Sequence, residues 1–193
     1  MSVTYPIKNK NALTHFKNYY AAIKPNPRNY TMIIMGLNTA FRIGDLLKLQ
    51  WKDVYDESAG HLRTHICIEE QKTGKLRMVP INPAESKALT HYHAICRQKL
   101  PEDYLFPSLR DKKTPISRYQ AYRIVKEAAT ESGLAEHISC HSLRKTFGYH
   151  AWKQGTPPAM LMDLYNHSSY KVTKRYLGIE QDERDDVYMH IEL

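Results

Sequence analysis

The chain has 193 residues, a length that suits one domain or two small ones and that can bury a core without metal or disulfide support. Hydrophobic residues make up 42% of it and charged residues 25%, which argues against wholesale disorder. The 28 lysines and arginines outnumber the 20 aspartates and glutamates. The formal net charge of +8 favours an acidic partner, nucleic acid before an anionic membrane.

The charge is divided unevenly along the chain. From Gly178 to the end the net charge is −5, whereas the first 177 residues carry +13. A basic body with an acidic tail indicates that the two parts do different jobs.

The cysteines and the apolar segments indicate where in the cell the protein is expected. Cys67, Cys96 and Cys140 are widely spaced and form no C-x-x-C pair, so we expect neither a disulfide framework nor a structural zinc site. Residues 1–10 lack the apolar core of a signal peptide, and the longest apolar run, residues 32–37, is too short to cross a membrane. We therefore expect a cytoplasmic protein with no membrane partner.

Apolar residues at helical spacing, with prolines and glycines between them, predict a succession of helices. Thr39 is a candidate N-cap for the third of these helices, and Gly133 and Gly155 are placed to end two later ones. The predicted helices span residues 11–24, 27–37, 42–49, 83–99, 117–133, 142–154, 157–165, 169–177 and 182–190.

One stretch has a period of two. Residues 63–71 and 76–81 alternate on either side of a turn at residues 72–75, which predicts a β-hairpin. The fold class is therefore mainly α with a small antiparallel β-sheet (α+β), near residues 62–82. Strands do not alternate with helices, which argues against a Rossmann or barrel fold.

Two stretches in the first half carry reactive side chains. Arg42 and Asp45 lie three residues apart and share one face of a predicted helix, where the alternative is an ordinary surface ion pair. Lys72 lies at the hairpin tip, from which it can reach into a groove or simply remain solvated.

Two more stretches follow in the second half. His141 and Arg144 lie at the start of a helix, where backbone amides favour an anion and the guanidinium adds a fork that matches phosphate oxygens. His167 precedes Tyr176 by nine residues. Each has an ordinary alternative: a partly buried histidine, or one packing residue among 14 tyrosines.

The order and spacing of the four stretches together resemble the tyrosine recombinase (phage integrase) family over about residues 13–179. TAFRIGDLLKL, QKTGKLRMVPI, HSLRKTFGYH and YNHSSYKVTKRYLGI match its first-Arg box, Lys hairpin, H-x-x-R box and His-to-Tyr segment. The departures are mild. Tyr165 and Asn166 stand where Leu-Gly is common, Lys145 where a second His is frequent, and Phe41 where Leu or Met is usual.

The resemblance implies the family's catalytic-domain fold over residues 1–179. It also implies an acidic tail helix, residues 180–193, that packs either on a neighbouring protomer or on its own domain. The implied catalytic residues are Arg42, Lys72, His141, Arg144, His167 and Tyr176. Asp45 is expected to hold Arg42 in place.

The implied reaction is DNA strand transfer without metal, ATP or any cofactor. Tyr176 attacks the scissile phosphate and forms a 3′-phosphotyrosine, Lys72 protonates the 5′ oxygen, and His141 assists as acid or base. Two arginines at the phosphate are expected to favour the phenolate form of the tyrosine. The implied partners are double-stranded DNA, a homotetramer on DNA and accessory DNA-bending proteins, in a bacterial or phage-encoded protein of the nucleoid.

Further basic side chains are candidates for phosphate contacts on the surface. They are Lys75, Arg77, Arg118, Arg123, Lys171 and Lys174.

Other functions remain open at this stage. They are a non-catalytic DNA-binding regulator on the same fold, DNA relaxation of the topoisomerase IB type, and, far less favoured, RNA binding. Integration, excision and inversion are not distinguished. Most family members carry an N-terminal clamping domain, so the chain is either a single-domain recombinase similar to the fimbrial invertases or a fragment.

Overall fold

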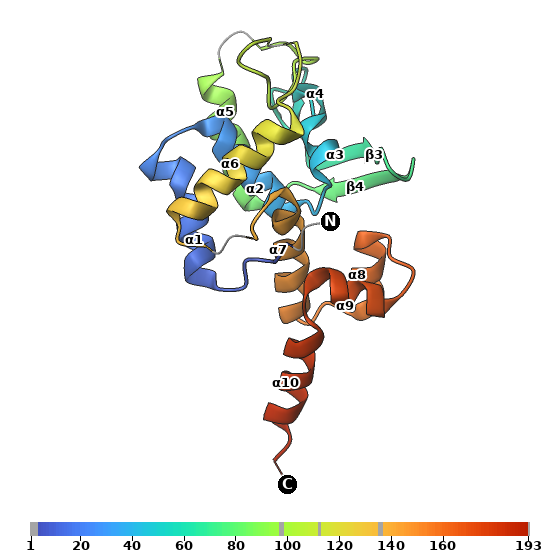
Figure 1. Cartoon of the computed structure of the whole chain (residues 1–193). Helices are drawn as coiled ribbons and strands as arrows, with labels where there is room; N and C mark the ends of the chain where they lie inside the picture. Colours follow the sequence, from blue (N-terminus) through green and yellow to red (C-terminus); the bar gives the residue numbers. More distant parts are fainter. Residues whose placement is uncertain (1–3, 97–98, 112, 135–136, 193) are drawn as a thin grey trace.

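The computed structural model describes residues 4–96, 99–111, 113–134 and 137–192, and their elements are labelled in Figure 1. The helices are α1 (Lys10–Asn18), α2 (Pro27–Asn38), α3 (Ile43–Leu47), α4 (Trp51–Val54), α5 (Pro83–Ile95), α6 (Arg118–Glu131), α7 (Cys140–Lys153), α8 (Pro158–Tyr165), α9 (Tyr170–Leu177) and α10 (Glu180–His190). A π-helical turn, η1 (Tyr19–Ile23), continues α1. The strands are β1 (Tyr55–Asp56), β2 (His61–Leu62), β3 (His65–Glu69) and β4 (Leu76–Pro80).

The predicted fold class is confirmed: helices dominate, and the hairpin is present. β3 and β4 pair antiparallel in a register that sets Ile66 opposite Val79 on the covered face. The structure adds α4 and the short β1–β2 pair, which the sequence pattern did not predict because elements of two to four residues are too short to show a period.

The turn before α3 corrects one expectation. Thr39 is not an N-cap; it is the C-cap of α2, and its hydroxyl donates to the Met35 carbonyl at 2.8 Å. A threonine hydroxyl often bonds back to the carbonyl four residues earlier. The backbone then turns through Ala40, at φ 53°, and α3 begins at Ile43 with Arg42 as its N-cap.

Three helix boundaries also differ from the predicted ones. α5 ends at Ile95 rather than near Lys99. α7 begins at Cys140 because Ser139 caps it, accepting the His141 amide. The tail helix α10 begins two residues early, at Glu180.

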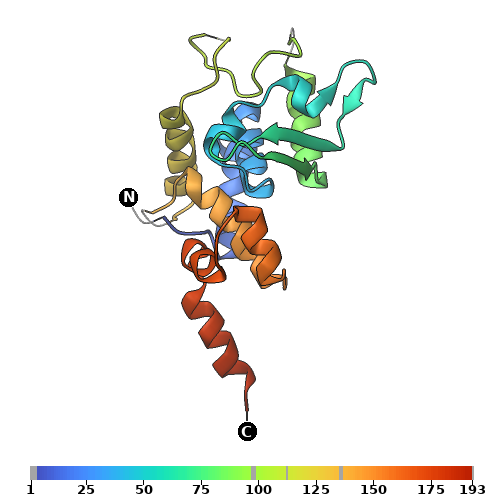
Figure 2. The ribbon, with the colours of Figure 1, turned by 90° about the vertical axis from the view of Figure 1, so that its right-hand side faces the viewer.

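The main core surrounds α2, most of whose side chains are buried. α2 packs against α5 on one side and α7 on the other, and Figures 1 and 2 show this central position. Trp51 and Tyr92 close the end of the core near the hairpin, with ring centroids 5.2 Å apart.

A second, smaller core joins α8 and α9 to α7. Its buried members include Tyr149, Tyr165 and Leu177, and Tyr176 packs against it. Gly148 on α7 permits this close approach: a Cβ there would lie 2.4 Å from the Tyr165 hydroxyl and 2.5 Å from Leu177. The position of Tyr176 therefore depends on a glycine contact between helices.

α10 extends away from the body (Figures 1 and 2), and none of its residues is buried. No helix within the described ranges has the length and apolarity needed to cross a membrane.

We expect Gly148→Ala to lower the free energy of unfolding by about 1–3 kcal/mol, because the added methyl group overpacks the contact with Tyr165 and Leu177. Urea denaturation measures the change. Gly44→Ala is the matched control, since a Cβ at Gly44 meets only the end of the Arg118 side chain. Equal stability of Gly148→Ala and wild type would contradict this account of the small core.

The buried Glu85 makes stability depend on pH. Burial raises the pKa of its carboxyl to about 7, although the hydrogen bond from the Asn82 amide acts in the opposite direction. The folded protein therefore holds a proton that the unfolded chain loses near pH 4.5. Stability from this proton is present below pH 4.5 and is lost as pH rises through 7.

Relative to Glu85→Gln, we expect wild type to lose on the order of 2–3 kcal/mol of unfolding free energy between pH 5 and pH 8. Chemical denaturation of both proteins at each pH measures this difference. Glu131→Gln, at an exposed position of α6, should keep the wild-type pH dependence. A pH-independent difference between wild type and Glu85→Gln would show that Glu85 folds as a carboxylate.

Candidate active site

Six side chains predicted to act together line one cavity of about 580 Å³. They come from the start of α3, the β3–β4 turn, α7, the α8–α9 connection and α9. They are Arg42, Lys72, His141, Arg144, His167 and Tyr176. The fold thus brings together residues that lie up to 134 positions apart in the chain.

Arg42 is held by a carboxylate that the sequence did not single out. Its Nη1 donates to Glu70 Oε2 at 2.8 Å, and Glu70 lies just after β3. Asp45, expected to hold Arg42, instead accepts the Gln71 amide at 3.0 Å through Oδ1. Asp45 therefore binds the hairpin to α3, and the carboxylate on the Arg42 guanidinium is that of Glu70.

Arg144 is buried, with 3% of its surface exposed. Its guanidinium donates to the Ala40 carbonyl and lies over the Tyr165 ring, 4.7 Å from the centroid. The Tyr165 hydroxyl donates in turn to the Arg144 carbonyl at 2.8 Å. These contacts fix a guanidinium fork in the wall of the cavity.

The amino end of α7 offers less to an anion than expected. Ser139 already accepts the His141 amide through its hydroxyl and the Ser142 amide through its carbonyl. Attraction for an anion in this cavity therefore falls mainly to side chains. Desolvation, together with the charges of Lys145, Arg144, Arg42 and Arg118, lowers the pKa of His141.

His167 is oriented by a buried hydroxyl. Its Nδ1 lies 3.1 Å from Thr173 Oγ1, and its ring meets the Tyr176 ring edge-on with centroids 5.2 Å apart. Burial and the charges of Arg144, Arg42 and Lys72 lower the pKa of His167. At neutral pH both histidines of the cavity are therefore mostly uncharged imidazoles.

Tyr176 lies against the small core with its phenol facing cations. Burial raises its pKa above the ordinary value, whereas the charge and hydrogen bond of Arg144 and the charge of Arg42 act to lower it. In the free protein, burial outweighs the arginines, which act in the direction expected of them. Lys145 lies over the same ring at 5.1 Å and donates to the Thr4 carbonyl at 2.6 Å.

Lys72 is exposed at the hairpin tip and lines the cavity beside Thr73. The turn is closed by the Gly74 amide, which donates to the Glu70 carbonyl at 2.8 Å, with Gly74 at φ 65°. This glycine sits in the left-handed region that a tight turn requires.

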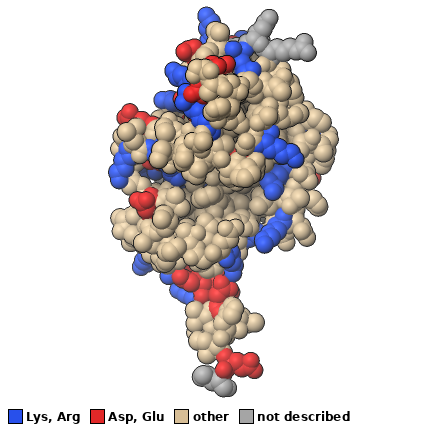
Figure 3. Space-filling view, turned by 180° about the vertical axis from the view of Figure 1, so that it is seen from behind, with Lys and Arg blue, Asp and Glu red and all other residues tan. Residues whose placement is uncertain are grey.

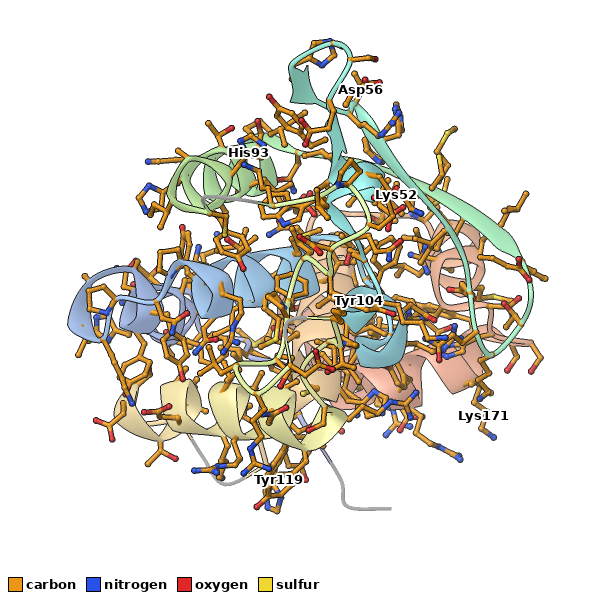
Figure 4. The ribbon with its side chains drawn as sticks, turned by 90° about the horizontal axis from the view of Figure 1, so that it is seen from above. Lys52, Asp56, His93, Tyr104, Tyr119 and Lys171 are labelled. Atoms are coloured by element: carbon orange, nitrogen blue, oxygen red, sulfur yellow. The ribbon has the colours of Figure 1, made fainter. Side chains whose placement is uncertain are left out.

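The surface cations expected at DNA divide into two groups. Arg123 and Lys171 are exposed, and Lys171 points outward in Figure 4. Arg118 is also exposed, and its guanidinium lies where a Cβ added at Gly44 would meet it.

The other three basic candidates are occupied by the protein itself. Lys75 donates to Asn166 Oδ1 at 2.9 Å, and Lys174 pairs with Glu183 at 2.7 Å. Arg77 has 14% of its side chain exposed and donates to Glu70 at 3.1 Å, which leaves little of it for a phosphate contact.

Four further residues that support this site were not predicted from the sequence. Glu70 and Thr173 are buried and polar, and Tyr165 and Lys145 pack on Arg144 and Tyr176. A glutamate near the end of the predicted strand was the one available signal for Glu70, because a carboxylate that becomes buried there needs cations nearby. In the part of the chain described, no group of three or more His, Cys, Asp or Glu side chains could hold a metal ion.

Comparison with known proteins gives a consistent result. The model of the phage integrase family matches residues 8–183. The probable integrase/recombinase YoeC of Bacillus subtilis is 40% identical over 182 residues, which cover 94% of this chain and 93% of YoeC. The type 1 fimbriae regulatory protein FimE of Escherichia coli K12 is 29% identical, with 77% of this chain and 73% of FimE covered.

A tyrosine recombinase of Pseudothermotoga lettingae is 30% identical, over 83% of this chain but 53% of the recombinase. Among solved structures, XerA recombinase superposes with a TM-score of 0.73 at 19% identity, over all of this chain and 65% of XerA. XerH recombinase bound to difH gives 0.73 at 18% identity, over 97% of this chain and 53% of XerH. The chain thus spans about half to two thirds of these three proteins. The extent of the family match and the identity to YoeC show that this chain belongs to the phage integrase family of tyrosine recombinases.

Proposed function

We propose that the chain is a site-specific DNA recombinase that cuts and rejoins double-stranded DNA through a covalent 3′-phosphotyrosine at Tyr176. The observation that carries this proposal is the single cavity lined by a tyrosine, two arginines, a lysine and two histidines. Such a reaction serves the integration, excision or inversion of a DNA element. YoeC and the Xer proteins, by their names, belong to the same class.

In the proposed first step, Tyr176 Oη attacks the scissile phosphorus and the bond to the 5′ oxygen breaks. The phenol is neutral in the free protein, so its proton must leave during attack, and the uncharged imidazole of His141 or His167 is available to accept it. Lys72 supplies a proton to the departing 5′ oxygen. A 5′ hydroxyl of another strand then reverses these transfers and restores the phosphodiester.

Charge on the phosphoryl oxygens would be stabilised by side chains already fixed in place. Arg144 is held by the Ala40 carbonyl and Arg42 by Glu70, so neither guanidinium has to be ordered at the moment of reaction. Preorganised donors of this kind contribute more than flexible ones. Of the six basic candidates, Arg118, Arg123 and Lys171 have exposed side chains, and these are the phosphate contacts that we propose.

Tyr176→Phe should abolish covalent attachment to DNA while leaving non-covalent binding intact, because only the nucleophilic oxygen is removed. The measurement uses nicked suicide substrates made from DNA that flanks the gene, without metal, and a denaturing gel that shows the protein–DNA adduct. Tyr170→Phe is the matched control and should keep the adduct, because Tyr170 lies on the same helix but its hydroxyl donates to Glu183.

No adduct with wild type, together with intact salt-sensitive binding, would favour a DNA-binding regulator. An adduct that persists in Tyr176→Phe would assign the nucleophile to another residue.

We propose that residues 1–179 form the catalytic domain and that the end of α10 packs on a neighbouring protomer in a DNA-bound homo-oligomer. The acidic half of α10 is bound within the chain: Asp182 pairs with Lys8 at 2.7 Å and Asp186 with Lys153 at 3.0 Å. Figure 3 shows acidic side chains gathered at the base of this tail. The apolar half is not covered, since Tyr188 is 80% exposed and Met189 82%. Leu193, also expected in this contact, lies outside the described residues.

Truncation after Asp186 keeps the ion pairs and removes the apolar end. We expect cleavage of an isolated half-site at the wild-type rate, but loss of cooperative binding to a full site and at least a tenfold loss of recombinant product. Gel-shift titration and a recombination assay measure these two quantities. Normal cooperativity in the truncated protein would place the contact within one chain.

A further inference from the structure

We infer that Glu70 is a positioning residue of this site: its buried carboxylate holds Arg42 and the Lys72 turn in place together before DNA arrives. The inference rests on the proposed function, because it concerns how two groups of that reaction are placed. Glu70 itself does not line the cavity in which the six reactive side chains meet.

The contacts of the Glu70 carboxylate join three segments. Oε2 accepts Arg42 Nη1 at 2.8 Å and the Thr73 hydroxyl at 2.8 Å, and Oε1 accepts Arg77 Nη1 at 3.1 Å. Arg42 begins α3, and Thr73 adjoins Lys72 in the turn. One carboxylate oxygen thus links the Arg42 guanidinium to the residue next to Lys72.

The backbone of Glu70 defines the same turn. Its amide donates to the Lys75 carbonyl at 3.0 Å, and its carbonyl accepts the amides of Thr73 and Gly74 at 3.3 and 2.8 Å. Both the main chain and the side chain of Glu70 therefore shape the segment that carries Lys72. A shift of this residue would move the lysine and the arginine together.

Arg77 holds the carboxylate from the other side. Its guanidinium also donates to the Leu164 carbonyl at 3.1 Å and the Thr39 carbonyl at 3.3 Å. It lies 5.5 Å from the centroid of the Phe41 ring. Arg77 is thereby fixed to α8 and to the turn before α3, and it gives Glu70 a stable support rather than a solvated surface pair.

The electrostatics agree with a permanent ion pair. Burial alone would raise the pKa of Glu70, but hydrogen bonds from Arg42, Thr73 and Arg77 outweigh it and hold the pKa at about 2. The carboxylate is therefore charged at neutral pH. Since 5% of its side chain is exposed, salt in solution screens this interaction little.

Loss of a purely structural residue would lower DNA affinity and cleavage rate together. Loss of the Glu70 carboxylate should lower only the cleavage rate. Glu70→Gln keeps the size of the side chain but raises the charge around the cavity by one. Non-covalent affinity for DNA should therefore stay equal or rise, whereas a mobile Arg42 and a displaced Lys72 should slow cleavage. Misplacement of catalytic groups by about 1 Å costs roughly 100-fold in rate.

The experiment measures single-turnover cleavage of a nicked suicide substrate and, in the Tyr176→Phe background, non-covalent binding by gel shift. We expect Glu70→Gln to lower the cleavage rate roughly 10- to 100-fold at saturating protein with no loss of affinity. Glu70→Asp, which keeps the charge on a shorter side chain, should recover part of the rate. Glu127→Gln is the matched control, because that carboxylate also accepts three side chains, Tyr19, Tyr20 and Lys24, away from the cavity.

A wild-type cleavage rate in Glu70→Gln, or a rate that falls only in proportion to DNA affinity or folded fraction, would overturn the inference.

A second measurement does not depend on cleavage. In ¹⁵N-arginine-labelled protein, the Nη signals of Arg42, assigned with Arg42→Lys, should show restricted rotation that Glu70→Gln abolishes and Glu127→Gln preserves. Unchanged Arg42 signals in Glu70→Gln would also overturn it. Failure of wild type to cleave would count against the proposed function, while the arginine signals would still decide the placement of Arg42.

Discussion

Several cationic side chains share one cavity, and the need to offset their mutual repulsion determines how the groups around this cavity are arranged. Arg42, Arg144, Lys145 and Lys72 all line the same space, and Arg77 lies just behind it. Leaving like charges close together in a partly buried site is costly unless each finds an acceptor. Here most acceptors are neutral carbonyls: Ala40 for Arg144, Thr4 for Lys145, and Thr39 and Leu164 for Arg77. Glu70 contributes the one carboxylate among these acceptors, so the cavity keeps a positive excess for a phosphate.

The turn between α2 and α3 supplies several of these acceptors at once. Ala40 adopts the left-handed conformation at φ 53°, which costs a non-glycine residue on the order of 1 kcal/mol, and it is fully buried. Thr39 ends α2 with its hydroxyl on the Met35 carbonyl. The carbonyls of Thr39 and Ala40 are thereby free to accept Arg77 and Arg144. The same turn that stores local strain presents Arg42 at the start of α3.

These details explain which features could be predicted from the sequence. The long helices and the hairpin follow from period and from caps such as Ser117, since each is a local signal. The Ser139 cap was not predicted, so the start of α7 was placed too late. The six side chains that line the cavity were singled out because their order and spacing resemble a family pattern. The sequence did not predict that Glu70, and not Asp45, binds Arg42. The prediction placed Arg42 and Asp45 on one face of a helix, but Arg42 is the N-cap of α3 and its side chain reaches Glu70 instead. Thr39 was assigned to the wrong helix for a similar reason. A threonine between two helices can cap the end of the first helix or the start of the second, and the sequence alone does not distinguish the two.

The cations also determine which groups in the cavity can take up a proton. Burial raises the pKa of Tyr176 above its ordinary value, because it outweighs the two arginines that favour the phenolate. Burial, together with the same positive charges, lowers the pKa of His141 and His167, so that two uncharged imidazoles lie in a cavity lined by cations at neutral pH. A protonated phenol and two uncharged imidazoles are thus both consequences of burial, which acts against the cations at Tyr176 and with them at the histidines. Because a phosphate would bring negative charge into this space, its arrival would raise the pKa of the histidines and make them better proton acceptors as Tyr176 attacks.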